Sequence, residues 1–108
     1  MTNAKRLNEA EKIRIQVDPE IQDLIPGFIE NRKKDIVTIR EALGRNDYAV
    51  IRTLGHGMKG AGAGYGFEGI TDIGKCLEEA ALEGNRIEVE KQVLILSTYM
   101  DRLEIICE

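Results

Sequence analysis

Apolar residues recur at intervals of three and four through most of the chain, the spacing of helices that bury one face. Four such stretches follow one another, with apolar positions at Phe28, Ile29, Ile36, Ile39 and Leu43; Val50, Ile51, Leu54, Met58, Ala61 and Tyr65; Phe67, Ile70, Ile73, Gly74, Leu77 and Ala81; and Val89, Val93, Leu96, Met100, Leu103 and Cys107. Short polar or glycine-containing links separate them. The pattern predicts an all-α fold, an antiparallel up-down four-helix bundle.

Residues that commonly begin or end helices lie between these stretches. Asp18-Pro19 predicts the start of a short extra N-terminal helix, and Pro26 predicts that a new or kinked helix follows, because proline disfavours a helical conformation in the residue before it. The remaining boundary signals are predicted helix ends at Gly44, Gly66 and Gly84 and predicted caps at Asn46 or Asp47 and at Asn85.

The chain before Asp18 has a different pattern. Ile13, Ile15 and Val17 alternate with polar residues, which is the period of a strand. The sequence offers no partner strand, so we expect an extended segment that lies along the body. Residues 1–17 are therefore interpreted as an extended or flexible N-terminal segment, and residues 18–108 as the bundle.

Composition narrows the classes of function. A net charge of −4 over 108 residues weighs against nucleic acid as the main partner, because phosphate binding needs clustered lysine and arginine. Cys76 and Cys107 lack metal-site spacing and are expected to be free thiols. No signal peptide or membrane-spanning run is evident, so a cytoplasmic protein is expected, with no membrane partner.

The only histidine lies in the most glycine-rich stretch, Gly55 to Gly66, which holds six of the eleven glycines. At 100° per residue His56 lies about 200° around a helix from Leu54 and points away from the core. Lys59 is its neighbour on the same surface, and Gly60 leaves one flank of the imidazole without a side chain. The polar side of this predicted helix consists of Arg52, His56, Lys59, Gly60 and Ala63.

Helical structure here is unfavourable on intrinsic propensity alone. Glycine costs about 1 kcal/mol relative to alanine in a helix, so the glycines at 55, 57, 60, 62 and 64 together cost about 4–5 kcal/mol. Gly55-x-Gly57-x-x-Gly60 also matches the fingerprint of dinucleotide-binding loops, with 48–54 as the preceding strand. That fold needs several alternating strands and helices, so a small dinucleotide-binding domain remains a distant third interpretation.

The helical interpretation places chemistry at His56. Histidine side chains ordinarily titrate near pH 6.5, so a neutral imidazole is available as a nucleophile at cytoplasmic pH. A phosphorylated imidazole carries negative charge, which the ammonium of Lys59 would partly neutralise. A metal site is not expected, because one histidine without clustered ligands binds metal poorly.

These residues resemble the histidine-containing phosphotransfer (HPt) domain. The family pattern His-x-Leu-Lys-Gly, followed by a pair of small residues, corresponds to His56-Gly57-Met58-Lys59-Gly60-Ala61-Gly62, with Met58 in place of leucine and Gly66-Phe67 before the next helix. The Leu-Glu of the third helix, followed by alanine, corresponds to Leu77-Glu78 with Ala80 and Ala81. The resemblance extends over about Asp18 to Ile106.

The resemblance implies a phosphorelay carrier rather than a self-sufficient enzyme. His56 would accept a phosphoryl group from the aspartate of a response-regulator receiver domain, or from a sensor histidine kinase, and would pass it to another receiver. Lys59 would stabilise the group and Gly60 would give access to it. The receiver would supply Mg²⁺, so no tightly bound cofactor is expected, and the carrier is expected to be a monomer.

Such domains commonly orient the imidazole with a polar residue of the third helix. We expect Glu78 to hold Nδ1–H of His56 so that Nε2 faces solvent, with Lys75 one turn earlier in a supporting role. The main alternative from another class is a non-catalytic helical interaction module of a signalling protein, which would share the bundle but would not need His56.

Overall fold

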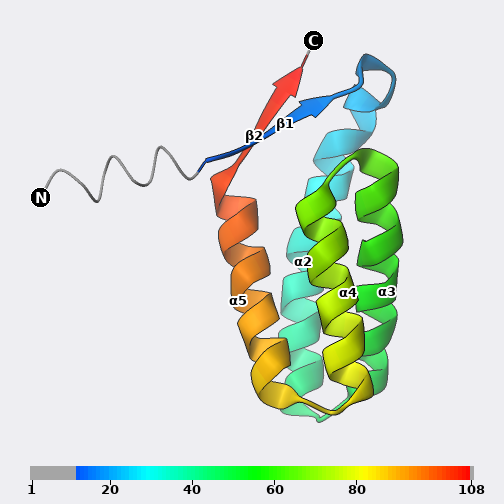
Figure 1. Ribbon diagram of the computed structural model, residues 1–108, viewed down its shortest axis with the longest axis vertical. Coiled ribbons are helices and arrows are strands. Elements are labelled where there is room, and N and C mark those ends of the chain that lie inside the picture. Colours follow the sequence, from blue (N-terminus) through cyan, green and yellow to red (C-terminus); the bar gives the residue numbers. More distant parts are fainter. Residues whose placement is uncertain (1–11, 108) are drawn as a thin grey trace, which may run out of the picture.

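A computed structural model describes residues 12–107, with only the backbone described at Cys107. In chain order the elements are β1 (Ile13–Val17), the 3₁₀ helix η1 (Pro19–Leu24), α2 (Ile25–Gly44), α3 (Tyr48–Tyr65), α4 (Glu68–Leu82), α5 (Arg86–Arg102) and β2 (Leu103–Cys107). The four long helices lie side by side, and the two strands project at one end (Figure 1). The described chain is therefore mostly helical, as predicted, with a small sheet in addition.

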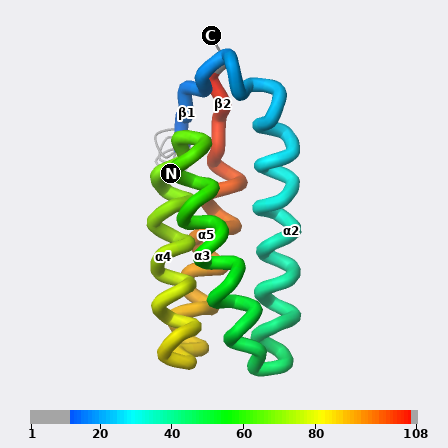
Figure 2. The backbone as a smooth tube through the Cα atoms, turned by 90° about the vertical axis from the view of Figure 1, so that its right-hand side faces the viewer, coloured from blue at the N-terminus to red at the C-terminus, as the bar shows by residue number. Residues whose placement is uncertain are grey.

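Short links join the helices at alternate ends. The links at 45–47 and 83–85 lie at the end remote from the strands, and the turn at 66–67 lies at the strand end (Figures 1 and 2). The most extensive contact between elements is that of α3 with α4, while α2 and α5 pack against this pair and against each other. The side chains of His56 and Glu78 come from this closest pair of helices.

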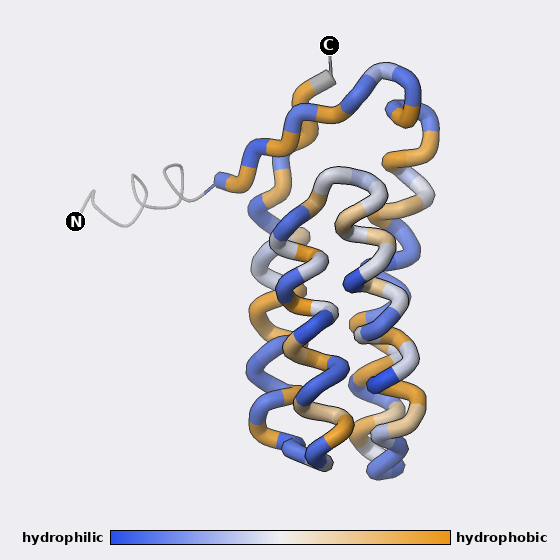
Figure 3. Tube along the Cα trace, turned by 45° about the vertical axis from the view of Figure 1, so that its right-hand side comes forward, coloured by the Kyte–Doolittle hydropathy of each residue, from blue (hydrophilic) through white to orange (hydrophobic). Residues whose placement is uncertain are grey.

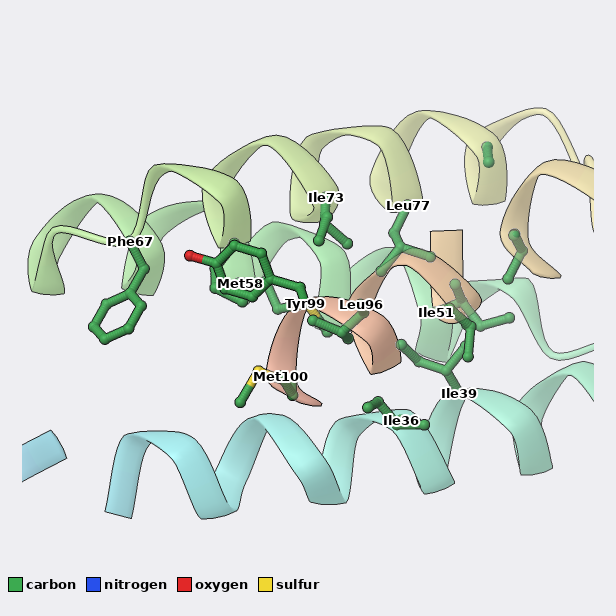
Figure 4. Close-up of a cluster of buried hydrophobic side chains, with 14 of the residues drawn as sticks. Ile36, Ile39, Ile51, Met58, Phe67, Ile73, Leu77, Leu96, Tyr99 and Met100 are labelled. Carbon is green, nitrogen blue, oxygen red and sulfur yellow. The ribbon is translucent and has the colours of Figure 1, made fainter. Parts of the chain in front are cut away.

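The predicted apolar stripes form one core. Apolar positions alternate with polar ones along each helix (Figure 3), and Ile39, Ile51 and Leu77 project between the helices (Figure 4). The fully shielded large side chains of the long helices are Ile39, Ile51, Met58, Ile70, Leu77, Val89 and Leu96, and Phe67 is equally shielded in the turn before α4. Removal of such surfaces from water, at about 25 cal/mol per Å², is the main stabilising contribution.

Most predicted boundaries are confirmed by local hydrogen bonds. The Asp18 carboxylate accepts from the Glu20 backbone N–H at 2.9 Å, Asp47 from Val50 at 3.3 Å, and Asn85 from the Glu88 N–H at 3.1 Å. These caps satisfy N–H groups that have no partner within the helix. The segment after Asp18 is a 3₁₀ helix, and α2 begins at Ile25.

The three glycines predicted to end helices lie at the ends of α2, α3 and α4, and two of them have the left-handed conformation. Gly66 follows α3 with φ +84°, and Gly84 follows α4 with φ +64°, values that side chains disfavour. Gly44 was predicted to cap α2 but is its last helical residue. The left-handed residue there is Asn46, with φ +56°, because asparagine tolerates this conformation better than most non-glycine residues.

The expectation that residues 13–17 have no partner strand was wrong. β1 pairs with β2 in parallel, from Ile13 opposite Leu103 to Val17 opposite Cys107. The last helix accordingly ends at Arg102 instead of continuing through Leu103 and Cys107. Positions 103 and 107 fit the helical spacing, but the apolar alternation of 103, 105 and 107 also fits a strand, and pairing with β1 decides between them.

The strand pair belongs to the same core as the helices. Val17 is fully buried, and Ile13, Ile15, Leu103 and Ile105 pack against the core. Residues 13–17 are therefore anchored by a sheet, whereas the rest of the predicted flexible segment, 1–11, lies outside the described residues. Within 12–107, the helices are too short or too polar for any of them to cross a membrane.

Candidate functional site

His56 lies near the middle of α3, on the face that phase analysis predicted. Its side chain is 70% exposed, whereas Ile51 and Met58 on the opposite face are buried. The 3.6-residue period separates these two faces. The imidazole is thus presented to solvent from the middle of α3.

Glu78, from α4, joins the two predicted site residues of α3. One oxygen, Oε2, lies 3.0 Å from Nδ1 of His56, and the other, Oε1, lies 3.0 Å from Nζ of Lys59. An ionised carboxylate can only accept, so Nδ1 carries the proton in this contact, and in the neutral ring Nε2 then keeps its lone pair. The contact with Glu78 thus involves Nδ1 and not Nε2.

The electrostatics of Glu78 fit this arrangement. The hydrogen bond from Lys59, followed by that from His56, lowers the pKa of the Glu78 carboxyl below its usual value. The carboxylate is therefore ionised at neutral pH. Its side chain is 21% exposed, against 40% for Lys59, so the bridge lies at the edge of the contact between the helices.

Backbone contact between α3 and α4 brings these residues together. A Cβ added to Gly55 would lie 2.7 Å from the Glu78 backbone N, and one added to Gly74 would lie 2.6 Å from the Gly55 carbonyl O. Side chains cannot fit at either position without moving the backbone. Glycine at 55 and 74 therefore fixes the helix separation across which Glu78 reaches His56.

A second close approach lies two turns further along α3. A Cβ on Gly62 would lie 2.6 Å from the Thr71 backbone N. The Thr71 hydroxyl also donates to the Lys59 carbonyl at 3.3 Å. Close packing at 55 and 62 offsets part of the unfavourable helix propensity of this stretch, whereas a Cβ at Gly57 or Gly64 would meet nothing within 4 Å.

The remaining predicted site residues differ in their placement. Gly60 is exposed, and a Cβ there would meet nothing within 4 Å, so this flank of His56 is open. Lys75 is exposed on α4, and its side chain makes no hydrogen bond or ion pair with other residues of the described chain. The structure thus brings His56, Lys59 and Glu78 together, with Gly60 beside them, and does not connect Lys75 to them.

One residue of the site was given no role by the sequence analysis. Arg52 lies one turn before His56, and both line an open hollow of about 400 Å³ together with Ala49, Thr53 and Glu78. Arginine four residues before histidine is a common surface pattern. What distinguishes Arg52 from an ordinary surface arginine is the hollow that it shares with His56. That hollow is lined in part by Glu78 of α4, so it cannot be recognised from the sequence of α3 alone.

The geometry bears on two other kinds of site. The glycines of the dinucleotide fingerprint all lie inside α3, so the strand, loop and helix that this fingerprint requires are not formed. Among residues 12–107, no cluster of three or more histidine, cysteine, aspartate or glutamate side chains could hold a metal ion.

Comparison with family models, with curated proteins and with solved structures finds no match to this chain.

Proposed function

We propose that this protein is a phosphorelay carrier that accepts a phosphoryl group on Nε2 of His56 and exchanges it with the aspartate of a receiver domain. The Glu78 carboxylate carries this proposal, because it contacts both Nδ1 of His56 and Nζ of Lys59 at 3.0 Å. The open flank at Gly60 and the resemblance of 56–62 to the HPt pattern support it.

The chemical step follows from the free lone pair. Nε2 attacks the phosphorus of an aspartyl phosphate, a P–N bond forms, and the P–O bond breaks with its electron pair returning to the aspartate carboxylate. The ring becomes an imidazolium while Nδ1 keeps its proton. Glu78 stabilises that positive charge, as carboxylates paired with histidine do in enzymes. The reverse step returns the group to a receiver.

Lys59 contributes at the phosphoryl oxygens. Lys59 lies one turn beyond His56, with its ammonium bound to Oε1 of Glu78, and in this proposal it is a cation that reaches the phosphoryl oxygens. At an exposed site such pairing stabilises by about 0–1 kcal/mol. The contribution rises when a docked receiver excludes water and lowers the effective dielectric constant.

The proposal includes the setting of the carrier. The helices are interpreted as an antiparallel up-down bundle, and the carrier as a cytoplasmic monomer that acts on sensor kinases and receivers without being a self-sufficient enzyme. Mg²⁺ would be bound by the receiver. Lys75 has no role in the transfer chemistry of this proposal, because it does not contact His56, Lys59 or Glu78.

Transfer from a phosphorylated receiver tests the proposal. The protein is incubated with a panel of ³²P-labelled receiver domains and Mg²⁺, and the label on it is measured over time. We expect an acid-labile, alkali-stable label on the protein and none on His56→Gln. Because His56 is exposed, this variant is expected to keep the helical circular dichroism of the parent.

Two results would contradict the carrier. Label that persists in His56→Gln would place the acceptor elsewhere. Absence of transfer from every receiver, with the fold intact, would favour the non-catalytic interaction module, which does not need His56.

A further inference from the structure

We propose that Arg52 is a second cation of the phosphoryl site and binds the oxygens of the group carried by Nε2 of His56. This inference rests on the proposed function. It adds a contacting residue to the predicted set of His56, Lys59 and Gly60.

Helix geometry places Arg52 on the side toward which the imidazole leans. The residues are one turn apart, a rise of about 6 Å, and side chains at this spacing are neighbours. Helical side chains tilt toward the N-terminus, so the ring of His56 lies over the turn that carries Arg52. The hollow of about 400 Å³ lies on this side, and small Ala49 and Thr53 complete its lining on α3.

Lys59 and Arg52 differ in the contacts that their side chains make before any phosphoryl group is bound. The Lys59 ammonium is already bound to Glu78 at 3.0 Å. Arg52 is exposed, and its side chain forms no hydrogen bond or ion pair with another residue of the described chain. Its guanidinium is thus available to an incoming anion without breaking an existing contact.

The charges of the site point to the same assignment. Before transfer, Arg52 and Lys59 each carry a positive charge and Glu78 a negative one. Transfer adds an imidazolium with one positive charge and a phosphoryl group with close to two negative charges. The phosphorylated site is therefore nearly neutral with Arg52 and carries one net negative charge without it.

Guanidinium geometry suits this ligand. Arginine presents paired N–H donors in a planar fork that matches two phosphoryl oxygens, whereas an ammonium acts as a point charge. Lys59 and Arg52 would thus approach the group from opposite sides along α3, one turn after and one turn before His56.

Chemical phosphorylation tests Arg52 without any receiver. Phosphoramidate phosphorylates exposed histidine: Nε2 attacks phosphorus, the P–N bond of the reagent breaks, and ammonia leaves. The phosphorylated protein is then titrated by ³¹P NMR to obtain the pH at which the phosphoryl group takes up a proton. A nearby cation favours the dianion and lowers this midpoint.

The variants are Arg52→Gln, Arg52→Lys and the control Arg40→Gln. Arg40 is exposed on α2 and lines a different hollow, between α2 and α5, so its replacement makes the same charge change away from His56. We expect Arg52→Gln to raise the midpoint by on the order of half a pH unit. Arg40→Gln should leave it unchanged, and Arg52→Lys should restore part of the shift.

Equal midpoints for Arg52→Gln and Arg40→Gln would overturn the role of Arg52, as would failure of phosphoramidate to label His56. The relay itself is judged separately, by transfer from receivers. Absent receiver transfer together with a normal Arg52 effect would reject the carrier but keep the anion contact. Normal transfer without the Arg52 effect would keep the carrier and reject the anion contact.

Discussion

At the scale of residues, the carboxylate of Glu78 holds the site together. It binds a ring nitrogen with one oxygen and an ammonium with the other, and both contacts span two helices. Both depend on its ionisation. The same interactions that lower its pKa therefore tie the geometry of His56 and Lys59 to pH.

Stability should fall in acid because of this residue. A carboxyl whose folded-state pKa is depressed contributes stability that is present above its unfolded-state value, here near 4.5, and is lost as pH falls through the lower folded-state value. We expect the thermal midpoint of the parent to fall more steeply below pH 4.5 than that of Glu78→Gln. The measurement is thermal unfolding by circular dichroism from pH 7 to pH 3.

Glu79→Gln is the matched control for this experiment. Glu79 is exposed on the same helix and forms no ion pair within the described chain. Its variant should follow the parent through the acid range. If Glu78→Gln also followed the parent, the bridge would contribute nothing to folding.

At the scale of elements, α3 and α4 form a pair whose backbones touch. Gly55, Gly62 and Gly74 lie where the helices meet, while Gly57 and Gly64 face open space. Because the backbones of α3 and α4 lie so close together, the side chain of Glu78 is long enough to reach His56 on the neighbouring helix. It also divides the helical glycines into those that are required and those that only weaken the helix.

Two neighbouring alanine substitutions distinguish these classes. Gly55→Ala would place a methyl group 2.7 Å from a backbone nitrogen and should lower the free energy of unfolding by about 1–3 kcal/mol. Gly57→Ala should instead raise it, by up to about 1 kcal/mol, because alanine favours the helix. Urea unfolding of both variants measures the difference, and effects of the same sign would disprove the contact.

The sequence predicted what depends on local period and failed where distant segments meet. The buried positions of α2 to α5 and the outward direction of His56 follow from a 3.6-residue repeat. That repeat does not show that Gly55 is required and Gly57 is not, because only Gly55 lies against α4. The partner of β1 lies some 90 residues away in sequence, and only the fold shows that Leu103–Cys107 completes a strand pair.

The proximity of Glu78 to His56 was predicted, but from family resemblance. Helix phase gave the exposed face of α3 but could not give the distance to α4. Arg52 was on the correct face and had no assigned role, because the hollow that it shares with His56 also requires Glu78.

At the scale of the whole molecule, the parallel strands connect the two ends of the described chain beyond the helices (Figure 1). Two-stranded sheets are marginally stable alone, so this one depends on the apolar side chains that it packs against the core. Val17 and Ile25 are buried close to this end. The sheet thus covers an end of the core that the helices leave uncovered.

Removal of residues 103–108 tests whether β1 and the helices depend on the strand β2. Without β2, strand β1 loses its partner, and its backbone amides in 13–17 should exchange with deuterium at rates close to those of an unfolded chain. Amides of α3 near Gly55 should stay protected, because the contact with α4 is independent of the sheet. Continued protection of 13–17 would show that β1 is held by side-chain packing alone.

The bridge from Glu78 also affects the kinetics of encounter. His56 and Lys59 already have fixed rotamers, held from another helix, before any partner arrives. The side-chain entropy that docking would otherwise remove has been lost during folding. In the proposed transfer, a receiver that approaches this face would meet His56 and Lys59 already oriented by Glu78, so a larger fraction of collisions would lead to reaction.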